Sequence, residues 1–462
     1  MTLRIDEQEL RARFRGELIF AGAAGYDEAR AVFNRRIDAK PLLIARPVDD
    51  DDVALALAYS TQEGAGVYIR GGGRNVAGYA TGPGVVIDLG LLRDVQVDPD
   101  TKVATFGGGA RASDVLRATQ AHGLAAVTGV AGHIGAGGLT LGGGIGWLSP
   151  RYGFACDNII AANLVTVDGT KLHVDGESDP ELLWALRGAG ANFGVVTSLT
   201  VKVHPVRDQV LAGDLTFDAA KSREVVQRVR ELNEDENEDF FVFLTYRRAD
   251  LSDAPLAPGQ AVLTVSVCHL GEPAQADAAI ARLRALGPAV DAVRLATYLD
   301  LHLAQDDTYP EVRQHWAAEH VADMDDDIVE ICEAVAGGIQ GESIVVAYPF
   351  RRSMSDSLDD RGAFACRDTG WDVTTLAFWR DIAHDDSYRT WADSLSEAIR
   401  EAGLVSTGVY PSMLSSCGPD RLREYYGDDR LERLRAVKDR LDPRNVLSHN
   451  ANITPTPAGG QR

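Results

Sequence analysis

Two glycine-rich segments constrain this chain more than any other feature of its sequence. The first covers residues 70–78 and reads RGGGRNVAG, and the second covers residues 135–146 and reads GAGGLTLGGGIG. Glycine has no Cβ and tolerates a positive φ, so consecutive glycines can turn backbone N–H groups toward an anion. Neither segment continues into Gly-Lys-Ser/Thr, and neither reads as a single strand-turn-helix unit. The pair is therefore suited to wrapping one phosphorylated ligand between two loops.

Length and charge narrow the class of protein. A chain of 462 residues is too long for one simple core, so two domains are expected. The 46 basic and 68 acidic residues leave a net charge of −22, which argues against a nucleic acid or an anionic membrane as partner. The partner expected is a small-molecule substrate. The sequence leaves the oligomeric state open.

The cysteines and acidic runs do not indicate a metal site. The five cysteines have no CxxC or CxxH spacing, which disfavours a zinc site or a disulfide framework. Acidic runs such as residues 49–52 are predicted to be helix starts or loop faces instead of metal ligands. The N-terminus lacks a signal-like pattern, and no run approaches about 18 apolar residues. A soluble cytoplasmic protein is the expectation.

The pattern of elements changes near residue 206. Up to that point short β-rich runs alternate with turns and a few helices. Beyond it, strands alternate with helices in the pattern of a sheet covered on one side. The strands are expected at residues 211–217, 240–245, 261–268, 344–347 and 373–378, and the helices at 221–232, 273–286 and 387–402.

The ordered set of motifs resembles a known flavoprotein family. Besides the two glycine segments, it comprises Asp157-Asn158, VDG at 167–169, LWALRGAGANFGVV at 183–196, YYG at 425–427, DPRN at 442–445 and NANI at 450–453. This set, which covers nearly the whole chain, is similar to the berberine-bridge-enzyme-like branch of the vanillyl-alcohol oxidase and p-cresol methylhydroxylase superfamily.

The resemblance implies an α+β fold with two parts. Residues 1–206 would form a PCMH-type FAD-binding domain. Residues 207–440 would form a substrate domain whose antiparallel sheet, covered by helices, makes the roof over the flavin ring. Residues 441–462 would return to the flavin domain, with a berberine-bridge-type motif at about 408–455.

The resemblance also implies a set of FAD-binding residues. They come from the two glycine segments, from the motifs that follow them and from the C-terminus. They are Arg70, Gly71, Gly72, Gly73, Arg74, Asn75, Gly78, Gly135, Gly138, Leu139, Gly142, Gly143, Gly146, Asp157, Asn158, Gly194, Val196, Asn450 and Asn452.

The two usual points of covalent attachment are missing. Relatives commonly bond the flavin through a histidine in the first segment and a cysteine near the second, and here these positions hold Arg74 and Ala131. The FAD is therefore expected to be non-covalent. Arg74 is suited to a phosphate or carboxylate because a guanidinium forks onto such groups. His133 is interpreted as a hydrogen-bonding or surface residue.

The catalytic candidates are Tyr410, Arg351, Arg352 and Trp379. Where relatives carry a run like Tyr-Gly-Gly-Ala, this chain has two arginines after Phe350, which would either make the pocket cationic and favour an anionic substrate or lie at a solvated strand end. Tyr410 lies in a Gly-x-Tyr match. It could act as a base only if positive charge lowered its pKa.

Two other segments are expected near the same pocket. Trp379 and Arg380 end a predicted strand and are placed beside the substrate. His315 and Trp316 are expected to approach the pocket from a helix, although core packing is the alternative for the tryptophan.

Three functions are weighed. The first is a flavin-dependent oxidase or dehydrogenase that moves a hydride from a small organic substrate to non-covalent FAD. The second keeps the fold but uses the deazaflavin F420, whose oligoglutamate tail would need cationic partners. The third is a binding protein that has lost its redox role, because function must be read from the site and not from the fold.

Overall fold

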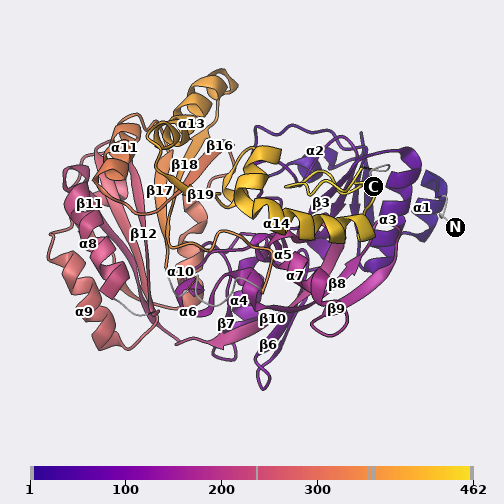
Figure 1. Ribbon diagram of the computed structural model, residues 1–462, viewed down its shortest axis with the longest axis horizontal. Coiled ribbons are helices and arrows are strands. Elements are labelled where there is room, and N and C mark those ends of the chain that lie inside the picture. The colour runs from indigo at the N-terminus through magenta and orange to yellow at the C-terminus, as the bar shows by residue number, and fades with distance from the viewer. Residues whose placement is uncertain (1–4, 236–237, 352–353, 355–360, 458–462) are drawn as a thin grey trace.

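The structure, a computed structural model, describes residues 5–235, 238–351, 354 and 361–457. In Figure 1 the N-terminal part of the chain forms one lobe and the middle part forms another beside it. Both lobes mix helices with sheets, so the α+β fold expected from the sequence is confirmed.

A four-stranded sheet opens the first lobe and leads into the first glycine segment. Its order is β1-β2-β4-β3, in which β4 is parallel to both of its neighbours and β1 is antiparallel to β2. The strands are β1 (Glu17–Phe20), β2 (Leu43–Arg46), β4 (Val85–Asp88) and β3 (Val67–Arg70), with short helices α1 (Glu7–Arg13) and α2 (Tyr26–Arg30) nearby in the chain.

Helix α3 (Asp50–Glu63) begins at the acidic run. The Asp49 carboxylate accepts hydrogen bonds from the backbone N–H groups of Asp51 and Asp52 at 3.0 and 3.1 Å. A carboxylate at this place satisfies amides that the helix itself leaves unpaired. The run is therefore a helix start, as the sequence predicts.

A six-stranded sheet forms the rest of the first lobe. Strand β10 pairs with β6, β7 and β8. The strands are β5 (Val95–Asp98), β6 (Val103–Gly107), β7 (Leu124–Ala126), β8 (Ile159–Val165), β9 (Lys171–Asp175) and β10 (Val195–Pro205), and the helices are α4 (Ala112–Gln120), α5 (Ala136–Gly142), α6 (Ser149–Tyr152) and α7 (Pro180–Ala189).

The second lobe is built on a nine-stranded antiparallel sheet. Its order is β14-β11-β13-β12-β17-β18-β16-β19, with β15 paired to β11. The strands are β11 (Val210–Asp218), β12 (Phe240–Arg248), β13 (Ala261–His269), β14 (Val290–Asp291), β15 (Arg294–Ala296), β16 (Arg313–Val321), β17 (Ile344–Phe350), β18 (Gly370–Trp379) and β19 (Val405–Thr407).

The two faces of this sheet pack against different partners. Val242 and Leu244 of β12 belong to a core shared with the helices α8 (Ser222–Asp235), α9 (Pro273–Arg284), α11 (Asp326–Gly337) and α13 (Asp385–Glu401). Phe241 and Phe243 point the other way and pack on Trp147 of the first lobe. This alternation follows the two-residue period of a strand, and it turns the uncovered face toward the glycine segments.

Two local expectations need correction. His315 and Trp316 lie on strand β16 and not on a helix, because the whole stretch pairs with β18 and alternates between the two faces. The second glycine segment contains helix α5 where the sequence suggested a loop.

The last long helix brings the chain back to the first lobe. Helix α14 (Pro419–Leu441) crosses back in Figure 1, and its buried Lys438 donates a hydrogen bond to the carbonyl of Asn192 at 2.9 Å. The return therefore begins before residue 441. A further short helix, α10 (Tyr298–Ala304), packs near α4.

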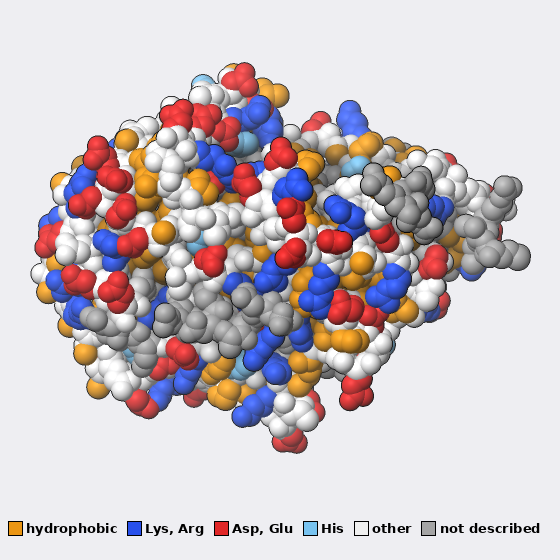
Figure 2. All heavy atoms as spheres, viewed as in Figure 1, with side chains coloured by type: hydrophobic (Ala, Val, Ile, Leu, Met, Phe, Trp, Pro, Cys, Tyr) orange, Lys and Arg blue, Asp and Glu red, His pale blue; other side chains and the backbone are white. Residues whose placement is uncertain are grey.

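The surface carries charged side chains of both signs. Figure 2 shows acidic and basic side chains interspersed over the face in view. None of the described helices is long and apolar enough to cross a bilayer. All five cysteines are free thiols.

Candidate functional site

The two glycine segments meet backbone against backbone. A Cβ placed on Gly72 would lie 2.5 Å from the Cα of Gly135, and a Cβ on Gly135 would lie 2.4 Å from the amide nitrogen of Gly72. Separations this short cannot be accommodated without moving one backbone away from the other. Glycine is therefore required at both positions to bring the segments together.

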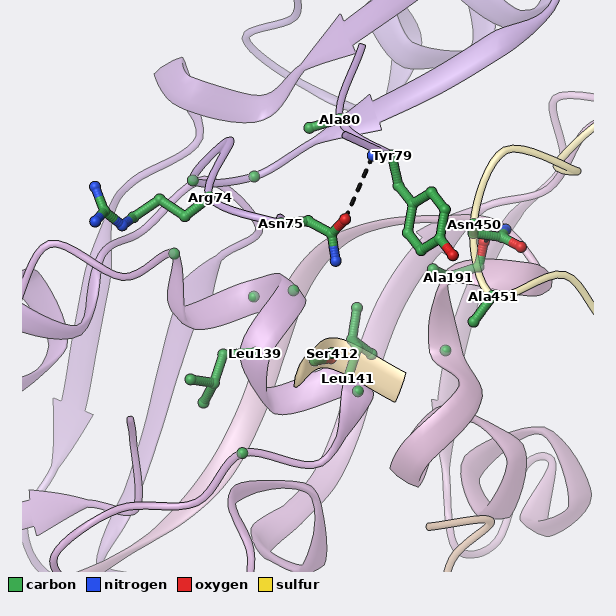
Figure 3. A pocket seen from close by; sticks show the side chains of 18 of the residues that line it. Arg74, Asn75, Tyr79, Ala80, Leu139, Leu141, Ala191, Ser412, Asn450 and Ala451 are labelled. Carbon is green, nitrogen blue, oxygen red and sulfur yellow. Dashed lines mark hydrogen bonds between the residues drawn. The ribbon is translucent and has the colours of Figure 1, made fainter. Parts of the chain in front are cut away.

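A cavity of about 370 Å³ lies along this contact and extends to the uncovered face of the large sheet (Figure 3). In Figure 3, Arg74 extends away from Tyr79 and Asn450, which lie toward the other side of the view. The residues expected from the sequence that line the cavity are Gly71, Gly72, Gly73, Arg74, Asn75, Gly135, Gly138, Leu139, Gly142, Gly194, Val196, Tyr410 and Asn450.

The lining has features that fit a phosphorylated cofactor. Within the described ranges, the backbone N–H groups of residues 72–75 donate no hydrogen bond to the protein. A Cβ added to Gly138 would meet no atom within 4 Å, so this glycine leaves open space where the cavity runs. Free amides beside bare glycine backbone form the kind of cradle that phosphate groups occupy.

Other predicted cofactor residues support the walls without lining the cavity. Arg70 donates hydrogen bonds to the carbonyls of Ala29 and Ala80 at 2.5 and 3.2 Å. Gly78 packs against Ile37. Asn452 also lies outside the lining. The direct contact with cofactor that the sequence suggested for these three residues is therefore not supported by the geometry.

The motif at residues 157–158 has a structural role. The Asp157 carboxylate receives two hydrogen bonds from the Arg367 guanidinium, at 2.5 and 3.1 Å, and both side chains are almost fully buried. Asn158 donates to the carbonyls of Tyr152 and Phe154. Their hydrogen-bonding groups are therefore committed to the protein and do not reach the cavity.

Two glycines of the second segment are required for packing. Gly143 lies against the ring of Phe364, and Gly146 lies against the carbonyl oxygen of Thr128, at distances that leave no room for a Cβ. Neither lines the cavity. Glycine is needed at both positions because protein atoms, and not the cofactor that the sequence analysis expected, lie against them.

Tyr410 lines the cavity, as expected, but its hydroxyl is engaged. It accepts a hydrogen bond from the backbone N–H of Gly144 at 3.3 Å. Burial raises the pKa of Tyr410 to about 12. The side chain is therefore a neutral phenol that holds the second glycine segment in place, and no cation lowers its pKa as a base would need.

Of the two arrangements considered for the arginines after Phe350, the cationic pocket does not apply to Arg351, which lies outside the cavity lining. The Arg351 guanidinium donates to the carbonyls of Phe240 and, at 2.9 Å, of Asn233 in the last turn of α8. The carbonyls that end a helix lack intrahelical partners, which is why a guanidinium settles there. Arg352 lies outside the described residues.

Trp379 and its neighbour are also directed away from the cavity. The Trp379 indole donates to Asp385 at 2.7 Å and stacks on Tyr388, on the side covered by α13. Arg380 is exposed and pairs with Glu342 at 3.1 Å. His315 pairs with Asp393 of α13, whereas Trp316, its neighbour on β16, lines the cavity.

Arg74 lies in a polar cluster at the wall of the cavity. Its guanidinium lies 3.7 Å from the ring centre of Phe33, donates to the carbonyl of Tyr309 at 3.0 Å and lies 3.7 Å from the Glu311 carboxylate. Burial lowers the pKa of Arg74 to about 10. The carboxylate beside Arg74 therefore belongs to Glu311 of the protein and not to a ligand.

His133 belongs to the same cluster. Its Nδ1 lies 2.8 Å from the Asp306 carboxylate, and its backbone N–H donates to the same oxygen at 2.9 Å. Burial and the charge of Arg74 lower the pKa of His133 to about 4. His133 is therefore a neutral, hydrogen-bonded residue of the cavity wall, as the sequence interpretation proposed.

Aromatic side chains line the cavity near Arg74, and only Trp316 among them was named from the sequence. Phe33, Tyr309, Trp316 and Tyr348 contribute rings from four separate segments, and Leu376 of β18 adds an aliphatic surface. The hydroxyls of Tyr309 and Tyr348 meet at 3.2 Å. The alternation along β16 and β17 could have placed Trp316 and Tyr348 on one sheet face, but it could not have placed that face over the glycine segments.

Comparisons with known proteins show similarity along most of the chain. The sequence model of a family described as FAD binding domain matches residues 41–175, and one described as berberine and berberine like matches residues 406–454. (R)-6-hydroxynicotine oxidase of Paenarthrobacter nicotinovorans is 32% identical over 95% of this chain and 97% of its own. The FAD-linked oxidoreductase pgmH of Aspergillus terreus is 27% identical over 95% and 94%.

Solved structures give the same result. The crystal structure of 6-hydroxy-D-nicotine oxidase from Arthrobacter nicotinovorans matches with a TM-score of 0.88 at 29% identity, over 96% of this chain and 98% of that one. A berberine bridge enzyme variant matches with a TM-score of 0.83 at 18% identity, over 97% and 98%, which is a likeness of fold alone.

Proposed function

Because the chain belongs to the berberine-bridge-enzyme-like family of FAD-linked oxidoreductases, we propose that it oxidises a small aromatic amine or alcohol. The reaction would remove a hydride from the carbon that bears the nitrogen or oxygen, with FAD held non-covalently. The observation that carries this proposal is the aromatic wall formed by Tyr309, Trp316 and Tyr348 in the cavity that the glycine segments line.

Different groups of the chain would bind different parts of FAD. The free amides of residues 72–75 and the bare backbone at Gly138 suit the phosphates. Asn450, whose amide nitrogen donates to the carbonyls of Ala191 and Leu447, holds the C-terminal segment against the same cavity. When bound, FAD supplies the two-electron acceptor.

Non-covalent binding is supported by what stands at the two attachment positions. Ala131 is fully buried and carries no reactive group. Arg74 is committed to Phe33, Tyr309 and Glu311. The comparisons name FAD and offer nothing in favour of the deazaflavin alternative.

The lining favours a neutral or cationic aromatic substrate over an anionic one. Arg74 is the single Lys or Arg among the described lining residues, and the nearby negative charges of Glu311 and Asp306 offset its positive charge. The aromatic rings of the lining offer a substrate apolar surface and ring faces of negative potential, which suit a neutral or cationic molecule. A bacterial relative is named for the oxidation of 6-hydroxynicotine, and compounds of that class are the first to test on this chain.

The experiment is a substrate screen on purified protein that has been saturated with FAD. Paired aromatic amines, alcohols and carboxylic acids are offered under air, and oxygen consumption and hydrogen peroxide are measured, with FAD-free protein as control. The proposal expects turnover of an amine or alcohol. Turnover of carboxylates only, or protein that binds a deazaflavin and not FAD, would contradict it.

A further inference from the structure

The two cavity tyrosines form a hydrogen-bonded pair. Tyr309 comes from the loop that follows α10, and Tyr348 comes from β17 on the uncovered face of the large sheet. Their hydroxyls lie 3.2 Å apart, and the side chains are nearly buried, with 9% and 5% of each residue exposed. Within the described residues, neither hydroxyl has a second hydrogen-bond partner.

The two hydroxyls have two O–H donors but form only one hydrogen bond with each other. Burial raises the pKa of both tyrosines, so both hydroxyls keep their protons near neutral pH. Two phenols share a single O–H···O bond, which leaves one O–H without an acceptor. A buried donor without a partner is unfavourable, and such a group in a cavity wall indicates a ligand that supplies the acceptor.

Arg74 fixes one member of the pair. The guanidinium donates to the backbone carbonyl of Tyr309 at 3.0 Å, and its other side is held by Glu311 and by the ring of Phe33. The charge of Arg74 also opposes the effect of burial on the pKa of Tyr309. The segment that holds Tyr309 is therefore tied to the first glycine segment by the residue at the usual attachment position.

We propose that the Tyr309–Tyr348 hydroxyl pair is the polar anchor for the substrate and that Arg74 is the positioning residue for Tyr309. The ligand class is a small aromatic molecule with one hydroxyl, amine or carbonyl group that accepts the free O–H. The choice of ligand class rests on the proposed function. The anchor itself concerns only this chain's side chains.

The test compares two probes that differ by one hydroxyl, 4-chlorophenol and chlorobenzene. Dissociation constants are measured on FAD-saturated protein by ligand-observed NMR titration. Wild type is expected to prefer 4-chlorophenol by about tenfold, the value of one buried hydrogen bond. The double variant Tyr309→Phe/Tyr348→Phe should abolish most of this preference and leave the affinity for chlorobenzene unchanged. Either single substitution frees the O–H of the remaining tyrosine and should lower the preference only in part.

The matched control is Tyr246→Phe. Tyr246 is a fully buried tyrosine whose hydroxyl has no partner among the described residues, but it lies in the core on the helix-covered face of the sheet. This variant should keep the full preference. Equal affinity of wild type for the two probes, no saturable binding of 4-chlorophenol, or a preference that survives both cavity substitutions would overturn the proposal.

Arg74 is tested by rescue. Arg74→Met should lower the preference as Tyr309→Phe does, with unchanged chlorobenzene affinity, and Arg74→Lys should restore part of it. Full preference in Arg74→Met would overturn the positioning role. Bound flavin is measured on the same samples. Protein that does not take up added FAD but still prefers 4-chlorophenol would refute the proposed function and leave the anchor standing.

Discussion

The contact between the glycine segments gives a prediction whose size follows from the structure. In Gly135→Ala the new Cβ would lie 2.4 Å from the amide nitrogen of Gly72, and a backbone atom cannot turn aside as a flexible side chain can. Forcing an extra carbon into such a contact costs about 1–3 kcal/mol of folding free energy. The two segments should separate, and FAD affinity should fall as well.

Two further glycines separate the contributions of folding and binding. In Gly138→Ala the Cβ meets nothing within 4 Å of the protein, and alanine in the helix α5 is up to about 1 kcal/mol better than glycine. The FAD-free variant should therefore be as stable as wild type or slightly more so. Its added methyl would enter the part of the cavity proposed for the cofactor, so FAD affinity should fall roughly tenfold, equivalent to about 1.4 kcal/mol.

Gly176→Ala is the matched control. This glycine meets no atom within 4 Å and lies outside the cavity. Its stability should stay within about 0.5 kcal/mol of wild type, and its FAD affinity should be unchanged. The assay is urea unfolding of FAD-free protein together with titration of FAD, because bound ligand adds stability by mass action. Wild-type stability in Gly135→Ala, or wild-type FAD affinity in Gly138→Ala, would refute the reasoning.

Three other predictions concern single residues. Asp157→Asn leaves the buried Arg367 without its carboxylate and should lower the free energy of unfolding in urea by about 3–5 kcal/mol. The dissociation constant for FAD should change little. Arg351→Met should lower stability without changing the affinity for any substrate, and a selective loss of anionic substrates would contradict this. Burial holds the pKa of His302 at about 4, below its unfolded value of 6.5, so the unfolded chain binds the proton first as the pH falls. The contribution of His302 to stability should therefore decrease by up to about 3 kcal/mol between pH 6.5 and 4, and His302→Asn should make the loss of stability over this range less steep.

Local pattern was enough to predict that the two glycine segments line one cavity. Both glycine segments were placed on one ligand from residue type alone, because runs of glycine are rare outside sites that need close backbone approach. The strands of the large sheet were located from their β-rich runs, and the structure has a strand at each of those places. Membership of the family followed from the order of the motifs.

The substrate end could not be read in the same way. Arg351 and Trp379 were considered for the pocket because of their positions in the sequence, but a strand directs alternate residues to opposite faces. Their side chains instead donate hydrogen bonds to the end of helix α8 and to the Asp385 carboxylate. Tyr309 and Tyr348 are brought together by the fold. No local pattern predicts such a meeting, because the two residues lie 39 positions apart and meet only when the loop after α10 packs against β17.

The central claim is a non-covalent FAD in the cavity that the glycine segments line, and the mass of the denatured holoprotein tests it most directly. The protein is precipitated with acid, and the chromophore is sought in the pellet and in the supernatant by mass spectrometry. The account predicts a polypeptide of unmodified mass and free FAD in solution. A polypeptide heavier by one FAD, or a released chromophore other than FAD, would contradict it.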